Sequence, residues 1–388
     1  MKKYFFLILI SWISFTTLNA QWEPCSKGLP VCEAACLLVD GNNTYCGIDC
    51  GIYLSTDYGV TWVSQNKSLL DSDITSMAIS GNYFFVGTDL GGIFLSTNKG
   101  ENWIEKNNGL LSLDLKWVRS IVINGNNIFA GTNKGIFLST NHGDDWISKN
   151  NGLTDLDTIV FSMLISGNNV YAGTAGGIFM STDNGNNWIA KNKGLTNLSI
   201  QSLAINGNKI FTGTGSGIFM STDFGDNWTE KDSGIPKLDF EAFAFRGNNI
   251  FAGSFDGGIY LSTDNGDSWT AYNSGLSCTE NICIAINGNY IFTGAVFCLY
   301  FRANLSDFGI NVDLPPKEFI IYPNPANNEL TIHNDFEGIQ DIIIWNILGQ
   351  NVYQSELIGN VVKIDISVFA NGYYFIRVNG RTQMFVKI

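Results

Sequence analysis

The residues best suited to chemistry in this chain are the acidic and aromatic side chains of one short stretch. STDNGNNW, residues 181–188, places a carboxylate, two turn formers, a glycine and a tryptophan within eight residues. Such a stretch could be a calcium loop, a sugar site or a well-formed turn. The pattern occurs six times, beginning at Ser55, Ser96, Ser139, Ser181, Ser221 and Ser262, with steps of 41, 43, 42, 40 and 41 residues.

The acidic position of this motif is not always acidic. Two copies carry Asn, which is a poorer calcium ligand than a carboxylate. Asp and Asn both accept hydrogen bonds from nearby backbone N–H groups, the glycine allows a left-handed conformation, and the tryptophan ring packs between sheets. We therefore predict a structural turn, and we expect no metal and no cofactor. The structural positions are Asp57, Asn98, Asn141, Asp183, Asp223 and Asp264, with Trp62, Trp103, Trp146, Trp188, Trp228 and Trp269.

The elements around the motif explain the period. Repeats of about 40 residues with strand-like content are typical of propeller blades, and the turn signals within one repeat predict four antiparallel strands. The inner-strand pattern occurs seven times, from ACLLVDGN to CIAINGN. The last unit lacks an outer strand, whereas QWEPCSKGLP, residues 21–30, matches the end of the other units and places Trp22 at the motif tryptophan. We expect an all-β, seven-bladed propeller over residues 21–303, closed by the N-terminal strand.

The cysteines gather at the two ends of this region. Five lie between residues 25 and 50, and three lie between residues 278 and 298. A ring that closes there would bring both groups together, and the hairpin register predicts a Cys25–Cys298 disulfide. The other pairings stay open.

Composition and termini narrow the function classes. Residues 1–20 read as a secretory signal peptide, and Gln21 rather than a cysteine follows the cut. No later stretch is apolar enough for a transmembrane segment in the mature chain. A net charge of -13 argues against nucleic-acid binding. With two histidines in the chain, most histidine metal sites and Ser-His-Asp triads are excluded.

A site is expected on the face opposite the motif, which carries the loops entering each inner strand and the loops between the second and third strands. Thr75, Arg119, Phe161, Gln201, Glu241 and Ile282 hold equivalent positions there. The predicted ligand-binding residues are Trp117, Arg119, Gln201 and Glu241, and no catalytic residue is assigned. The alternative is that these loops form a solvent-exposed rim that binds no ligand. A glycosidase would need two facing carboxylates, for which Asp73, Asp157, Asp239 and Glu241 are candidates.

The motif resembles the Asp-box, or BNR repeat, of sialidases, other glycosidases, sortilin-type receptors and photosystem assembly factors. In that family the box caps the hairpin between the third and fourth strands of a blade. Sialidase chemistry would require three arginines to clamp a carboxylate, and Arg119, Arg246 and Arg302 cannot easily converge. The compact, loop-poor units are more similar to the assembly factors, which implies protein binding.

The C-terminal region after the propeller reads as a linker, residues 304–318, followed by a small β-sandwich, residues 319–388. It closely resembles the type A C-terminal sorting domain of the type IX secretion system. The matching positions include Tyr322, Pro323, Asn324, Pro325, Gly349, Gly372 and Lys387. The resemblance implies the type IX machinery as a partner and an extracellular or outer-membrane surface location.

The sequence therefore predicts an exported propeller that binds a glycan or a surface protein. A secreted glycoside hydrolase of the Asp-box class is the alternative.

Overall fold

The computed structural model describes residues 22–67, 69, 73–110, 117–296, 300–310, 319–322, 326–334, 339–358, 361–378 and 381–388. Those residues form strands and turns, together with two short 3-10 helices, η2 (Asp155–Thr158) and η3 (Leu305–Phe308). The predicted all-β class is confirmed. The chain divides into two compact units, Met1–Asn311 and Val312–Ile388.

Each repeat of the larger unit begins with a seven-residue strand and continues with a six-residue strand. Both runs are rich in Ile, Val and Phe, which favour strands, and an Asn-Gly or similar turn joins them. The first strands are β2 (Ala34–Asp40), β6 (Ile74–Ser80), β10 (Val118–Asn124), β14 (Val160–Ser166), β18 (Ile200–Asn206), β22 (Phe240–Arg246) and β26 (Asn281–Asn287). The second strands are β3 (Asn43–Ile48), β7 (Tyr83–Thr88), β11 (Asn127–Thr132), β15 (Asn169–Thr174), β19 (Lys209–Thr214), β23 (Asn249–Ser254) and β27 (Tyr290–Ala295).

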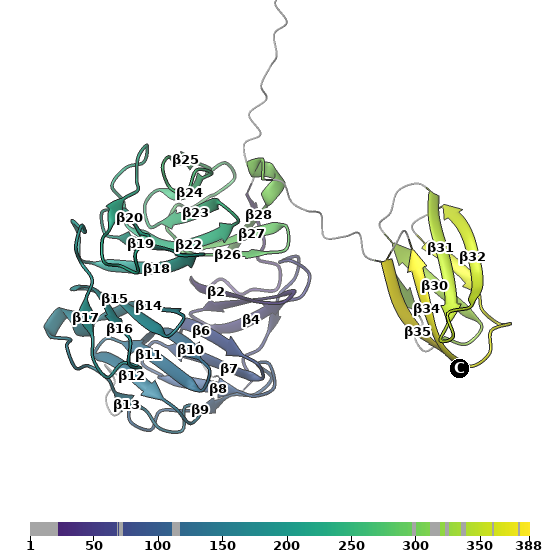
Figure 1. Ribbon diagram of the computed structural model, residues 1–388, viewed down its shortest axis with the longest axis horizontal. Coiled ribbons are helices and arrows are strands. Elements are labelled where there is room, and N and C mark those ends of the chain that lie inside the picture. The colour runs from purple at the N-terminus through teal and green to yellow at the C-terminus, as the bar shows by residue number, and fades with distance from the viewer. Residues whose placement is uncertain are drawn as a thin grey trace, which may run out of the picture. The chain divides into compact units, whose positions relative to one another are not determined.

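The third and fourth strands of each repeat are shorter and flank the motif. The third strands are β4 (Gly51–Ser55), β8 (Ile93–Ser96), β12 (Gly135–Ser139), β16 (Gly177–Ser181), β20 (Gly217–Ser221), β24 (Gly258–Ser262) and β28 (Tyr300–Asn304). The fourth strands are β5 (Val63–Ser64), β9 (Ile104–Glu105), β13 (Ile147–Ser148), β17 (Ile189–Ala190), β21 (Thr229–Glu230) and β25 (Thr270–Ala271). Consecutive strands pair into four-stranded antiparallel sheets, which Figure 1 shows arranged around a common centre.

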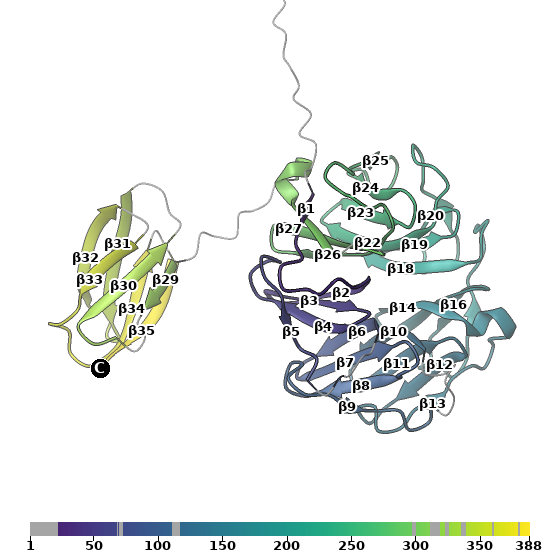
Figure 2. The same ribbon diagram turned by 180° about the vertical axis from the view of Figure 1, so that it is seen from behind.

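The last sheet of the larger unit joins the two ends of the repeat region. Its order is β1-β28-β27-β26, where β1 (Glu23–Pro24) comes from the N-terminus. Glu23 pairs with Arg302 and Pro24 pairs with Phe301, and Figure 2 shows β1 beside this sheet. The predicted pairing of the N-terminal strand with the last repeat is confirmed.

Tryptophans link neighbouring sheets. In each motif the indole N–H donates to a backbone carbonyl of the preceding repeat, as Trp188 does to Lys149 at 2.8 Å. Trp22 does the same for the closing sheet, because its Nε1 donates to the Tyr272 carbonyl at 2.7 Å. The side chain of Trp22 is buried. Each junction therefore buries one large ring with its polar atom satisfied.

The motif itself folds as a hydrogen-bonded turn. In the fourth copy, Asp183 accepts bonds from the Ser181 hydroxyl at 2.8 Å and from the Asn187 backbone N–H at 2.9 Å. Asn98 makes the same two bonds through its amide oxygen, from Ser96 at 2.8 Å and from Asn102 at 3.0 Å. The side chain at this position is occupied by turn bonds in both forms, which explains why Asp and Asn interchange.

The predicted Cys25–Cys298 disulfide requires correction. Cys25 is a buried free thiol, and Cys298 lies outside the described residues. The structure instead joins Cys32 to Cys50, and Cys278 is also disulfide-bonded. The hairpin register placed Cys25 correctly beside β28, but its side chain lies within the hydrophobic core of the closing sheet.

The described residues of the smaller unit form seven strands in two sheets. They are β29 (Phe319–Tyr322), β30 (Glu329–Asn334), β31 (Ile339–Asn346), β32 (Asn351–Ile358), β33 (Val361–Asp365), β34 (Gly372–Val378) and β35 (Arg381–Lys387). The sheet orders are β29-β30-β33 and β32-β31-β34-β35. Leu330 and Ile364 from the first sheet and Ile344 and Phe385 from the second share one buried core.

Candidate functional site

The first strand of every repeat contains a bulge at the same place. Pairing with the second strand skips one residue near the start, for example between Val118 and Ser120 of β10 and between Phe240 and Ala242 of β22. A bulge leaves its extra residue outside the ladder and turns its side chain in a new direction. The seven extra residues are Ala35, Thr75, Arg119, Phe161, Gln201, Glu241 and Ile282.

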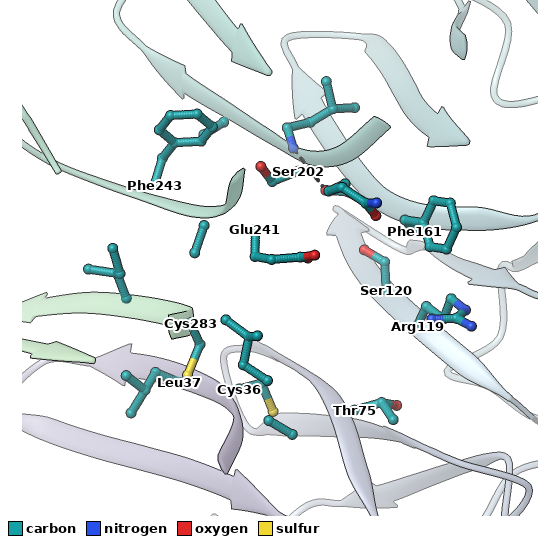
Figure 3. Close-up of a pocket in the computed structure, with 18 of the residues that line it drawn as sticks. Cys36, Leu37, Thr75, Arg119, Ser120, Phe161, Ser202, Glu241, Phe243 and Cys283 are labelled. Carbon is teal, nitrogen blue, oxygen red and sulfur yellow. Dashed lines mark hydrogen bonds between the residues drawn. The ribbon is translucent and has the colours of Figure 1, made fainter. Parts of the chain in front are cut away.

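All seven bulge residues line one cavity of about 520 Å³. Figure 3 shows Thr75, Arg119, Phe161 and Glu241 around it, each on a different inner strand. Trp117 also lines it. The structure therefore brings together the four residues predicted to bind a ligand, Trp117, Arg119, Gln201 and Glu241. They converge because the bulges of neighbouring repeats face the same central space.

The carboxyl group of Glu241 is strongly perturbed by its surroundings in the cavity. The pKa of its carboxyl is raised to about 7, chiefly by burial and then by the charge of Asp239, while Arg119 acts in the opposite direction. Figure 3 shows the side chain of Glu241 extending into the space that these residues surround. At neutral pH the group can either donate or accept a hydrogen bond.

Arg119 is held between two aromatic rings. Its guanidinium carbon lies 4.4 Å from the ring centroid of Trp117 and 5.1 Å from that of Phe161. Its Nε donates to Asn133 Oδ1 at 2.6 Å. Burial lowers the pKa of Arg119, an effect that the carboxylates of Asp89 and Glu241 oppose. The cation is therefore positioned by stacking and by one hydrogen bond.

The other candidate carboxylates do not line the cavity. Asp157 accepts bonds from the backbone and side chain of Thr154 at the start of η2. Asp239 accepts a bond from Gln201 Nε2 at 3.3 Å, and burial raises the pKa of both Asp239 and Asp73. Among the described residues that line the cavity, Glu241 is the one carboxylate.

Some residues of this face were not predicted from sequence. Ala35 completes the set of bulge residues, and Asn133 and Lys134 line a hollow beside Arg119. The last two follow β11, in a loop between second and third strands, which sequence analysis assigned to this face. That topological assignment was the available signal, but nothing in the sequence separates these two residues from the corresponding loops of other repeats.

In the smaller unit the structure describes part of the predicted sorting motif. Gly349 has a φ of 77° in the turn after β31, and Gly372 begins β34. Lys387 is buried and donates from Nζ to the Ile388 carbonyl at 2.8 Å. Tyr322 ends β29, while Pro323, Asn324 and Pro325 lie outside the described residues.

Comparison with known families identifies this region. Residues 320–388 match the family described as a secretion system C-terminal sorting domain. The chain therefore carries a type IX export signal and is sent to the cell surface or the extracellular space. Across the described residues, no helix has the length and apolar character needed to span a membrane.

A curated protein and several solved structures are similar to parts of the chain. Beta-agarase A of Zobellia galactanivorans is 39% identical over 64 residues, which are 16% of this chain and 12% of that protein. The extracellular domain of a one-component system from B. thetaiotaomicron has a TM-score of 0.62 at 17% identity, covering 82% of this chain and 46% of the other. The chain thus spans less than half of either relative.

Two further structures extend over most of the chain. PorZ of Porphyromonas gingivalis, a surface component of its type IX secretion system, has a TM-score of 0.56 at 15% identity, covering 91% of this chain and 59% of PorZ. A GH74 enzyme of Niastella koreensis has a TM-score of 0.59 at 11% identity, covering 95% and 74%. At such identities these likenesses show the propeller-type fold alone.

Proposed function

We propose that this chain is an exported binding module whose ligand, a glycan or a surface protein, occupies the central cavity. The observation that carries the proposal is the convergence of seven bulge residues on one space of about 520 Å³. This volume and the mixture of aromatic walls with a few polar groups are typical of ligand pockets. Among those polar groups, the Arg119 guanidinium is already fixed against Trp117, so binding costs little side-chain ordering.

The proposal includes a domain organisation. The four-stranded sheets of residues 21–303 are the seven blades of one propeller, and the repeated motif is an Asp-box that caps each hairpin. Residues 304–318 are a linker, and residues 319–388 are an Ig-like sorting domain. The pairing of β1 with β28 supports the closed ring, and the proposed signal peptide, residues 1–20, lies outside the described residues.

The test is a glycan-array screen of the chain from Gln21 to Ile388. Arg119→Ala and Glu241→Ala are screened beside it, with Glu101→Ala as a control that removes an exposed carboxylate from the motif face. Saturable binding that is lost in the first two variants and kept in the control supports the proposal. If no sugar binds, the proposal that the ligand is a glycan is wrong. Capture of surface proteins by the same variants then tests the proposal that the ligand is a protein.

A second candidate, a glycoside hydrolase, rests on Glu241. A carboxyl group with a pKa near 7 in a cavity has the property required of a general acid. Hydrolysis also needs a second carboxylate across the bond, and the cavity lining within the described residues supplies Glu241 alone. Release of reducing ends from a bound oligosaccharide, abolished in Glu241→Gln, would establish the hydrolase in place of the binding module.

A further inference from the structure

A second hollow adjoins the central cavity at the junction of β10 and β14. Its volume is about 430 Å³, and its lining residues are Arg119, Asn133, Lys134, Ile159 and Phe161. Arg119 and Phe161 also line the central cavity, so the two spaces meet at these side chains. We call the second space the Arg119–Lys134 groove. None of its lining residues in the described part of the chain is acidic, although the chain carries a net charge of -13.

The two cations of this groove are not paired with carboxylates. Apart from the bond from Nε to Asn133, no hydrogen bond or ion pair of the Arg119 side chain is found in the described part of the chain. The exposed Lys134 side chain likewise has no ion pair there. Lysines of other repeats differ, because Lys106, Lys191 and Lys231 each pair with an aspartate of the following repeat.

The position of Arg119 suits a bidentate ligand. Stacking on Trp117 and the bond to Asn133 fix the plane of the guanidinium, which leaves its two terminal nitrogens as donors. A planar fork of this kind matches the geometry of a carboxylate. Burial of Arg119 outweighs the attraction of Asp89 and Glu241, so a bound anion would compensate a charge that the free protein leaves partly uncompensated.

The backbone around the groove favours a sugar over an extended peptide. Peptides are often bound by main-chain bonds to an exposed strand edge. Here the Val118 carbonyl of β10 already accepts bonds from the hydroxyls of Thr75 and Ser76. The Met163 N–H of β14 donates to Ser120 Oγ at 3.0 Å. These two backbone groups of the neighbouring strands are already bonded, which favours recognition by side chains, and the amides of Gln201 and Asn133 can donate to and accept from hydroxyl groups.

We propose that the Arg119–Lys134 groove binds the carboxylate of a uronic acid, and that the ligand of the central cavity is an acidic oligosaccharide. This inference rests on the proposed binding function and names its ligand class. One sugar ring lies in the central cavity beside Gln201 and Glu241. The next ring places its carboxylate between the Arg119 fork and Lys134 Nζ.

The test is titration calorimetry of the chain from Gln21 to Ile388 with a tetramer of galacturonic acid and with its full methyl ester. We expect the acid to bind and the ester to bind at least about tenfold more weakly. A charge-assisted hydrogen bond contributes about a factor of ten in affinity. Lys134→Gln should weaken binding of the acid and leave binding of the ester unchanged, whereas Arg119→Gln should weaken binding of the acid more than binding of the ester, because Arg119 also lines the central cavity. Lys99→Gln, which removes an exposed lysine from the motif face, should change neither.

The outcomes separate this inference from the function on which it rests. Equal affinity for acid and ester would overturn the carboxylate subsite and leave the binding module standing. Unchanged affinity for the acid in both Arg119→Gln and Lys134→Gln would also overturn it. If Arg119→Gln misfolds, Lys134→Gln still tests the subsite, because Lys134 is exposed and its replacement should not disturb the fold. Tighter binding of a peptide of alternating Gly and Glu, lost in Arg119→Gln, would overturn the sugar assignment. Absence of binding by acid and ester would overturn the inference, while the array and capture screens still test the module.

Discussion

The replacement Glu241→Gln should change how the stability of the protein depends on pH. The pKa of Glu241 is raised from its ordinary value of 4.5 to about 7, because of burial and then of Asp239. Between these two values the folded protein binds the proton more strongly than the unfolded chain does. The stability that the protonated Glu241 contributes is therefore fully present below pH 4.5 and is lost as the pH rises through about 7. At about 1.4 kcal/mol for each pKa unit, a difference of about 2.5 units corresponds to at most about 3.5 kcal/mol.

The assay is urea unfolding at pH 4.5, 6 and 8, followed by tryptophan fluorescence. The unmodified protein should lose free energy of unfolding across this range, and Glu241→Gln should lose less, by up to about 3.5 kcal/mol at pH 8. Glu101→Gln, an exposed carboxylate on the motif face, should follow the unmodified protein. If the free energies of unfolding of Glu241→Gln and the unmodified protein change in parallel with pH, the reasoning is refuted. The ionised carboxylate would then be as stable in the cavity as in water.

Three further predictions concern the fold. Trp22→Ala removes a buried ring from the closing sheet and should cost about 3–5 kcal/mol in denaturant unfolding, whereas Val31→Ala, at a fully exposed position, should cost almost nothing. Asp264→Asn should keep the turn bonds and lower the melting temperature less than Asp264→Ala does; equal losses would show that the turn does not depend on an oxygen acceptor. Cys32→Ser with Cys50→Ser, which removes a bridge that spans 18 residues, should lower the free energy of unfolding by about 3 kcal/mol relative to the unmodified protein, measured by urea unfolding.

Much of the fold could be predicted because the sequence repeats a local pattern. Strand lengths, the Asn-Gly turns and the motif are decided within about 40 residues, by propensities and turn bonds that act locally. Trp22 could be placed because QWEPCSKGLP matches the other units, and its bond to the Tyr272 carbonyl agrees with that placement. The disulfide prediction failed because strand pairing fixes which backbones are neighbours and does not fix which way a thiol points.

The site was predictable in part for the same reason. Equivalent positions at the start of each inner strand could be aligned, so Arg119, Gln201 and Glu241 could be named together. Their residue types form no pattern that indicates a ligand, because the repeats bring these positions together whatever side chains they carry.

The sequence by itself determined the C-terminal export signal, the all-β class, the repeat and the closing strand, because each depends on local composition or on matching units. The tertiary structure decided which of these residues form a site. A bulge in each of seven inner strands turns one side chain toward a shared space, and the contacts of Arg119 with Trp117 and Phe161 place its guanidinium beside Lys134. These arrangements depend on contacts between repeats about 40 residues apart. Packing and desolvation between those repeats stabilise them, and neither can be derived from the sequence of one repeat.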